Sequence, residues 1–180
     1  TGEGGMLVCN DDEVADKCRK LRNLAFEPRG RRFIHHELGW NYRMTNLQAA
    51  LGVAQLEKME FHIERKRAIG QLYRQGLKDI KGFQLPMENT DYAQNIYWVF
   101  GLVADSEAQQ EAMVKKLGDA KIGTRPFFWC MHEQPVFKKM GLFENESYPV
   151  AEKLARNGFY IPSGLGLSDE DISKVINTLI

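Results

Sequence analysis

The sequence has 180 residues, of which 43% are hydrophobic and 27% are charged, proportions that are ordinary for a globular protein. Lysine plus arginine and aspartate plus glutamate both number 24, so no excess of charge favours nucleic acid or an anionic membrane surface as a partner. No apolar run approaches the roughly 20 residues that a transmembrane helix needs, and no signal-peptide pattern opens the chain.

The cysteines and histidines indicate a cytoplasmic location and no metal site. Cys9, Cys18 and Cys130 are odd in number and lack CxxC spacing, which is typical of reduced thiols in the cytoplasm. The four histidines are not paired with cysteines and show no HxxxH spacing. We therefore expect no structural zinc.

The first 45 residues predict a strand, a helix and a long loop. Residues 6–9 are apolar, with no earlier strand to pair with, and the chain lacks an initiator methionine, so we expect it to begin inside a domain. Asn10 and the acidic residues after it predict a helix that ends near Asn23. Val14, Cys18 and Leu21 predict its buried face, and a basic loop follows.

The longest predicted helix spans residues 46–79. Thr45 is a favourable N-cap, and Gln48, three residues later, completes a capping box. Apolar residues recur at spacings of three and four, which predicts one buried face. They are Leu47, Leu51, Ala54, Leu56, Met59 and Ile63. Gly52, Gly70 and Gly76 are points at which this helix could bend or divide, and the charged run at residues 64–67 predicts a solvent-exposed face.

The composition changes near Gly82 and predicts a second, smaller α+β unit. Strands are predicted at residues 83–85, 95–103 and 122–129, and helices at residues 106–118, 135–137, 148–157 and 168–180. The strand at 95–103 is so apolar that both of its faces should be covered. We therefore expect a division into residues 1–81 and 82–180, with the long helix as the link.

Four motifs occur in a fixed order: TGEGGM, GWNYRMTNLQAALG, IGTRPFFWCMHEQPVF and IPSGLGLSDEDI. Over essentially its whole length the chain resembles the C-terminal half of the DegT/StrS-type sugar-nucleotide aminotransferases, with the GDP-perosamine synthases as the nearest likeness. The resemblance implies an α/β fold of the aspartate-aminotransferase type (PLP fold type I): the end of a large domain, a long linking helix and a small α+β domain. It also implies homodimers with shared active sites.

The resemblance further implies pyridoxal phosphate (PLP), which acts as an electron sink while the protein holds its phosphate and ring. The implied reaction moves an amino group from glutamate to a 4-keto-6-deoxy sugar nucleotide, GDP-4-keto-6-deoxymannose, as in polysaccharide biosynthesis. In relatives the Schiff-base lysine lies a few residues before TGEGG, hence upstream of Thr1. We therefore expect no catalytic residue in this chain, which alone should be inactive. Two alternatives are a PLP-dependent keto-sugar-nucleotide dehydratase of the same family, in which histidine replaces that lysine, and a non-catalytic dimerisation fragment.

Asn41 and Arg43 resemble the residues that one subunit of the family places against the PLP phosphate of its neighbour. An amide and a guanidinium at a helix N-terminus suit a phosphate dianion. The alternative is that both residues only cap and brace the helix that follows.

Further candidates concern the nucleotide sugar. A basic loop containing His35 and His36 adjoins Asn41 and could bind the diphosphate, although a solvated loop is an equal alternative. Arg125 and His132 flank the aromatic residues 127–129, against which a sugar or base could rest. The alternative there is a buried strand in which Arg125 forms an ordinary salt bridge.

Overall fold

The structure is a computed structural model that describes residues 1–27 and 29–180. Pro28, beside the basic loop, lies outside the described residues. The chain forms two compact units, Thr1–Met59 and Glu60–Ile180. Within the described ranges, every helix is too short or too polar to cross a membrane.

The two helix starts predicted in the first unit are confirmed. Helix α1 (Asp12–Leu21) is capped by Asp11, whose carboxylate accepts a hydrogen bond from the Val14 backbone N–H at 3.0 Å. Helix α2 (Asn46–Leu56) begins with the capping box of Thr45 and Gln48. Local side-chain chemistry is sufficient to mark both ends.

Three other expectations for this unit are wrong. Residues 6–9 pair with no strand in the described chain, and Met6 and Val8 are 83% and 85% exposed. No residue of α1 or α2 is fully buried among the described residues: Cys18 and Leu21 on α1 are half-buried, and Leu47 and Leu51 on α2 are exposed. Apolar spacing shows which face of a helix can be buried, and burial also requires a partner.

The loop between α1 and α2 is fixed by backbone hydrogen bonds. The Trp40 N–H donates to the Leu21 carbonyl at 2.8 Å, the Leu24 N–H to Trp40 at 2.9 Å, and the Tyr42 N–H to Arg22 at 2.9 Å. Gly39 permits this approach, because a Cβ at that position would lie 2.3 Å from the backbone nitrogen of the fully buried Ala25. The segment before α2 is therefore anchored to the end of α1.

A cluster of ion pairs on α1 adds to this anchor. Glu37 pairs with Lys17 and with Lys20, whose ammonium lies 2.6 Å from the Glu37 carboxylate, and Lys20 also pairs with Glu27. The hydrogen bond from Lys17, followed by that from Lys20, lowers the pKa of Glu37 from its ordinary value of 4.5 to about 2.

These pairs predict how acid affects the loop. Because the folded pKa of Glu37 lies below its ordinary value, its stabilising contribution is present above about pH 4.5 and is lost as the pH falls toward about 2. In a variant that keeps Trp40 as its only tryptophan, the fluorescence of Trp40 should report loosening of the loop as the pH falls from about 4.5 to about 2. Glu37→Gln should already be loosened at neutral pH and should lose that acid transition. Asp16→Asn, which removes an exposed pair with Arg19, should behave like the parent protein. A parent-like acid transition in Glu37→Gln would contradict the assignment.

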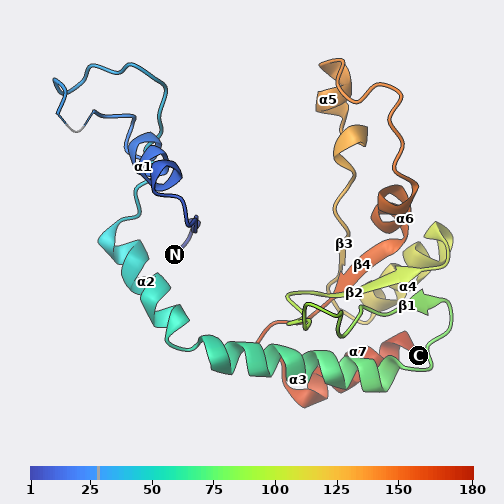
Figure 1. The fold of residues 1–180 in the computed structure, drawn as a ribbon. Helices are drawn as coiled ribbons and strands as arrows, with labels where there is room; N and C mark the ends of the chain where they lie inside the picture. Colours follow the sequence, from blue (N-terminus) through green and yellow to red (C-terminus); the bar gives the residue numbers. More distant parts are fainter. Residues whose placement is uncertain (28) are drawn as a thin grey trace. The chain divides into compact units, whose positions relative to one another are not determined.

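The second unit is built on an antiparallel sheet in the order β1-β2-β4-β3. Its strands are β1 (Phe83–Gln84), β2 (Phe100–Ala104), β3 (Arg125–Pro126) and β4 (Gly158–Ile161). Its helices are α3 (Met59–Leu77), α4 (Glu107–Asp119), α5 (Pro135–Lys139), α6 (Pro149–Asn157) and α7 (Asp169–Leu179), with a 3-10 turn, η1 (Met131–Glu133). Figure 1 shows α3 beside α7 and α5 at the tip of an arm that leaves the sheet after β3.

Side chains from α3, α4, α7 and the sheet form the core of this unit. Tyr73, Leu117 and Ile172 come from the three helices and meet Phe100 and Phe159 of the two central strands. Each of these five side chains is at most 1% exposed. The predicted starts of the flanking helices are confirmed, since Ser106 is the N-cap of α4 and Ser168 that of α7. Helices packed on an antiparallel sheet thus make this an α+β unit.

The long helix differs from its prediction in two ways. It divides into α2 and α3 at Glu57 and Lys58, and not at a glycine. The Glu57 N–H still donates to the carbonyl four residues earlier, whereas the Lys58 N–H donates to the carbonyl three residues earlier. No side chain there explains the division. The glycines of α3 instead allow close packing, since a Cβ at Gly70 would lie 2.2 Å from the Tyr97 ring and one at Gly76 2.6 Å from Ile176.

The charged run on α3 is also not a solvent-exposed face. Lys66 is half-buried, and its ammonium donates to the carbonyls of Trp98 at 2.9 Å and Ser163 at 2.6 Å. Arg65 binds the Leu167 carbonyl and lies 3.4 Å from the Asp169 carboxylate. Since α3 packs into the core of Glu60–Ile180, the structural units divide at Met59, whereas the composition changes near Gly82.

The strands are shorter than predicted, and one was missed. Strand β2 begins at Phe100 because Tyr97 adopts a left-handed backbone with φ of 51°, and β3 keeps only two of the eight residues predicted for it. Strand β4 follows directly after α6. The Asn-Gly pair at residues 157–158 marks the end of α6, but nothing in the four residues of β4 distinguishes a short strand from a loop.

Candidate functional site

Asn41 and Arg43 lie together immediately before the N-terminus of α2. The Arg43 Nε donates to the Asn41 Oδ1 at 3.5 Å, and both side chains are exposed. Asn41 is held in place by an antiparallel bridge to Asn23. The Asn41 amide nitrogen and the Arg43 terminal nitrogens have no acceptor in the described part of the chain. These free donors beside a helix N-terminus form a suitable set for a phosphate group.

The structure distinguishes the two histidines of the basic loop. The His35 Nδ1 lies 2.7 Å from the Leu24 carbonyl, and its ring packs on Phe26 at 4.9 Å. His35 is therefore used to shape the loop. His36 is exposed and has no hydrogen-bond partner among the described residues, so it is the histidine of the pair that remains available to a ligand. Arg32 packs its guanidinium over Phe33 at 5.2 Å.

Arg125 and the aromatic residues after it lie at the base of the arm, defined as residues 127–148. Arg125 is exposed on β3 and forms no ion pair in the described ranges, which disfavours the salt-bridge alternative. Phe127 turns inward over Gly101 and Gly158, where added Cβ atoms would lie within 2.6 Å of its ring. Phe128 turns outward and is 74% exposed.

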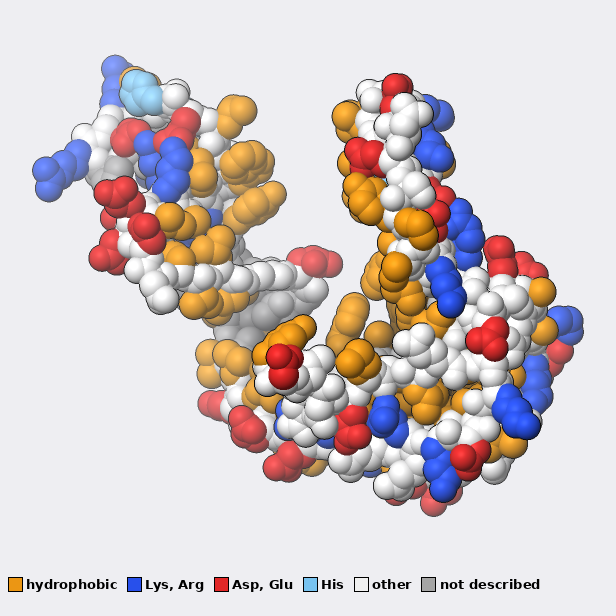
Figure 2. Space-filling view, turned by 45° about the vertical axis from the view of Figure 1, so that its right-hand side comes forward, with side chains coloured by type: hydrophobic (Ala, Val, Ile, Leu, Met, Phe, Trp, Pro, Cys, Tyr) orange, Lys and Arg blue, Asp and Glu red, His pale blue; other side chains and the backbone are white. Residues whose placement is uncertain are grey.

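Exposed hydrophobic side chains gather along the arm, as Figure 2 shows. They include Phe128, Trp129, Met131, Val136, Met140 and Tyr148. A contiguous apolar surface of this kind is typical of a binding face.

His132 is buried, with 8% of its surface exposed, whereas Arg125 is exposed. Its Nε2 lies 3.0 Å from the Glu152 carboxylate, which also accepts the Tyr148 N–H at 2.7 Å and the Ser147 hydroxyl at 3.2 Å. The backbone hydrogen bond from Tyr148 and then that from His132 lower the pKa of Glu152. A cavity of about 480 Å³ adjoins this network. Sequence reasoning missed Glu152, because no sequence signal joins it to a residue 20 positions earlier.

Cys130, also 8% exposed, lies at the start of η1. Burial raises the pKa of its thiol, so the sulfur stays protonated near neutral pH and is a weak nucleophile.

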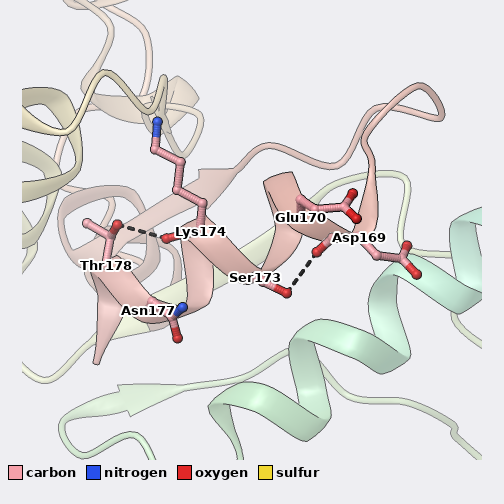
Figure 3. Close-up of a pocket in the computed structure, with 6 residues that line it drawn as sticks. All are labelled: Asp169, Glu170, Ser173, Lys174, Asn177 and Thr178. Carbon is pink, nitrogen blue, oxygen red and sulfur yellow. Dashed lines mark hydrogen bonds between the residues drawn. The ribbon is translucent and has the colours of Figure 1, made fainter.

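A shallow hollow on the outer face of α7 is a weaker candidate (Figure 3). The Ser173 hydroxyl donates to the Asp169 carbonyl and the Thr178 hydroxyl to the Lys174 carbonyl, each at 2.8 Å. Both hydroxyls are thus hydrogen-bonded within their own helix, and the hollow lies on a single helix face that also carries Lys174 and Asn177.

Sequence comparison identifies the family. All residues, 1–180, match the DegT/DnrJ/EryC1/StrS aminotransferase family. The chain belongs to this family. The GDP-perosamine synthase of Vibrio cholerae is 34% identical over 184 residues, covering 99% of this chain and 48% of that protein. The GDP-perosamine synthase of Escherichia coli O157:H7 is 33% identical over 179 residues, covering 99% and 47%. The chain thus spans about half the length of these relatives.

Structural comparison agrees with the family. DesV of S. venezuelae, solved in complex with a ketimine intermediate, superposes with a TM-score of 0.83 at 25% identity, covering 96% of this chain and 44% of that one. The predicted PLP fold type I is therefore confirmed, and the family implies PLP as cofactor. The free donors of Asn41 and Arg43 fit its phosphate.

Proposed function

We propose that the whole protein is a PLP-dependent aminotransferase that moves the amino group of glutamate to a 4-keto-6-deoxy sugar nucleotide, with GDP-4-keto-6-deoxymannose as acceptor and GDP-perosamine as product. The observation that supports this most is the similarity to two GDP-perosamine synthases over 99% of the chain. Both relatives are named as synthases of an amino sugar, which favours neither a dehydratase nor a non-catalytic fragment.

Asn41 and Arg43 are the residues that would hold the cofactor phosphate. When bound, PLP supplies an electron sink for the amino transfer. The guanidinium of Arg43 would offset the charge of the phosphate and the amide of Asn41 would help to orient it, while the bridge to Asn23 keeps Asn41 in position. We propose that this pair acts across a homodimer interface on the neighbouring subunit's cofactor, which requires a two-fold partner.

The substrate contacts follow from exposure and charge. Arg125 and His36 are exposed, and their guanidinium and imidazole groups can donate hydrogen bonds to the nucleotide sugar. Phe128 offers an exposed aromatic face to it. His35 and His132 support their segments through the Leu24 carbonyl and the Glu152 carboxylate, respectively. The free thiols of the described chain agree with a cytoplasmic location.

A substrate panel tests this function. The whole protein with PLP and glutamate would be offered 4-keto-6-deoxy sugars linked to GDP, UDP or dTDP, and the formation of 2-oxoglutarate would be measured for each. We expect the GDP sugar to give the highest kcat/KM. A preference for a UDP or dTDP sugar would keep the reaction class and overturn the assignment of the substrate.

Arg125→Ala is expected to raise the KM for the sugar nucleotide by about tenfold or more, because a charge-assisted contact contributes about 1.5–3 kcal/mol. The KM for glutamate should change little. Steady-state kinetics with each substrate varied in turn would measure both values, with Lys115→Ala, on an exposed pair with Asp119, as the control. Equal increases for both substrates would indicate a structural arginine.

A further inference from the structure

Three potential metal ligands cluster at the base of the arm, away from Asn41 and Arg43 in the sequence. The Cys130 sulfur, a ring nitrogen of His132 and a carboxylate oxygen of Glu133 all lie within 4.8 Å of one another. Cys130 and His132 are buried, and Glu133 is partly buried. All three belong to the short stretch around η1.

The hydrogen bonds around the cluster leave two ligand positions open. Glu152 accepts hydrogen bonds from three donors, so the His132 Nε2 donates to that carboxylate, and Nδ1 is the ring nitrogen left for a metal ion. One Glu133 oxygen binds Arg156 at 2.5 Å, whereas the other, Oε2, is buried and has no partner in the described chain. An unpaired buried carboxylate oxygen is costly, and this one is free to take a further ligand.

The surrounding residues resemble the outer shell of a metal site. Metal-bound histidines commonly donate their second ring N–H to a carboxylate, as His132 does to Glu152. Arg156, packed over Trp129 at 5.1 Å, orients Glu133 from its other oxygen. Lys138 lines the same cavity but forms no ion pair with Glu133 among the described residues.

We propose that Cys130, His132 and Glu133 bind a zinc ion, with water as the fourth ligand. Sulfur, nitrogen and oxygen together suit the borderline-soft Zn²⁺, and three protein ligands plus water are a common zinc arrangement. Binding releases the Cys130 thiol proton to solvent, because a coordinated thiol is deprotonated. The ion would tie η1 to α6 through Glu152 and so stiffen the base of the arm. The Cys-x-His-Glu spacing has neither paired cysteines nor HxxxH, which is why the sequence predicted no metal.

The test uses tag-free whole protein that is stripped with a chelator, desalted and given one equivalent of Zn²⁺. After gel filtration we expect one zinc per chain, and X-ray absorption at the zinc edge should show one sulfur at about 2.3 Å with nitrogen and oxygen at about 2.0–2.2 Å. Thermal unfolding should shift to higher temperature on zinc addition. No retained zinc, or a shell without sulfur, would overturn the site.

Variants locate the ligands. Cys130→Ser and Glu133→Gln should each weaken zinc binding by more than about 100-fold, a larger loss than outer-shell changes produce. Cys18→Ser should leave binding unchanged. Circular dichroism of the metal-free variants checks folding. If Cys130→Ser does not fold, the zinc affinity of Glu133→Gln and the zinc–sulfur distance in the unmodified protein test the site instead. Unchanged binding in Glu133→Gln, or loss in Cys18→Ser, would overturn the assignment.

Discussion

Replacing Arg43 by alanine is expected to lower the affinity of the whole enzyme for PLP by about 10- to 100-fold. Hydrogen bonds to charged groups contribute about 1.5–3 kcal/mol, and 1.4 kcal/mol corresponds to a tenfold change. Arg43 has its terminal nitrogens free beside the N-terminus of α2, where an anion is favoured. PLP retention after dialysis, followed by absorbance, would measure the loss.

Two further variants separate phosphate binding from bracing of the loop. Asn41→Ala should also weaken PLP retention, by a smaller factor, because a neutral amide is the weaker donor. Arg19→Ala, which removes an exposed arginine paired with Asp16 on α1, should retain PLP like the unmodified enzyme. Unchanged retention in both Asn41→Ala and Arg43→Ala would show that the pair only braces the helix.

Replacing Gly70 by alanine is expected to destabilise the second unit by about 1–3 kcal/mol, the usual cost of overpacking a core. The added methyl would lie 2.2 Å from the Tyr97 ring. That ring is 3% exposed and stacks on Phe100 at 5.8 Å, so it has little room to move. The loss should appear although alanine favours a helix over glycine by about 1 kcal/mol. Urea unfolding, followed by circular dichroism, would measure it.

The matched control is Gly118→Ala near the end of α4, where an added Cβ meets nothing within 4 Å. This variant should be neutral or slightly stabilising, because only the helix preference acts. If Gly70→Ala were as stable as Gly118→Ala, the close approach of α3 to Tyr97 would not exist in solution.

The sequence predicted the features that depend on neighbouring residues. The caps at Thr45, Ser106 and Ser168 were found because a side chain bonds its own helix start three residues later. The family was recognised because four motifs keep their order. Burial on α1 and α2 was mispredicted, because spacing alone does not show whether a covering element is present.

Features set by long-range packing could not be predicted. The glycines of α3 suggested bends, yet Gly70 and Gly76 meet residues that lie far along the chain. Lys66 belongs to a charged run, yet it bonds carbonyls 32 and 97 residues away. Strand β4 was missed because it has only four residues and owes its extended form to its pairing with β2 and β3.

The candidate site was predicted in part. The structure brings Asn41 and Arg43 together at the start of α2, as the helix-cap pattern allowed. The sequence did not distinguish His35 from His36 as the ligand-binding histidine. In the structure His35 contacts the Leu24 carbonyl, whereas His36 has no hydrogen-bond partner among the described residues. The burial of His132 depends on Glu152, a residue on a helix that follows the arm, and no local pattern indicates that contact.

The most direct test of the central claim uses glutamate labelled with ¹⁵N. The whole protein would be incubated with PLP, labelled glutamate and GDP-4-keto-6-deoxymannose, and the sugar nucleotide would be analysed by mass spectrometry. The account predicts a GDP-amino sugar that contains the ¹⁵N atom, formed together with 2-oxoglutarate. A product that has lost a hydroxyl group without gaining nitrogen, or an unchanged sugar nucleotide, would contradict it.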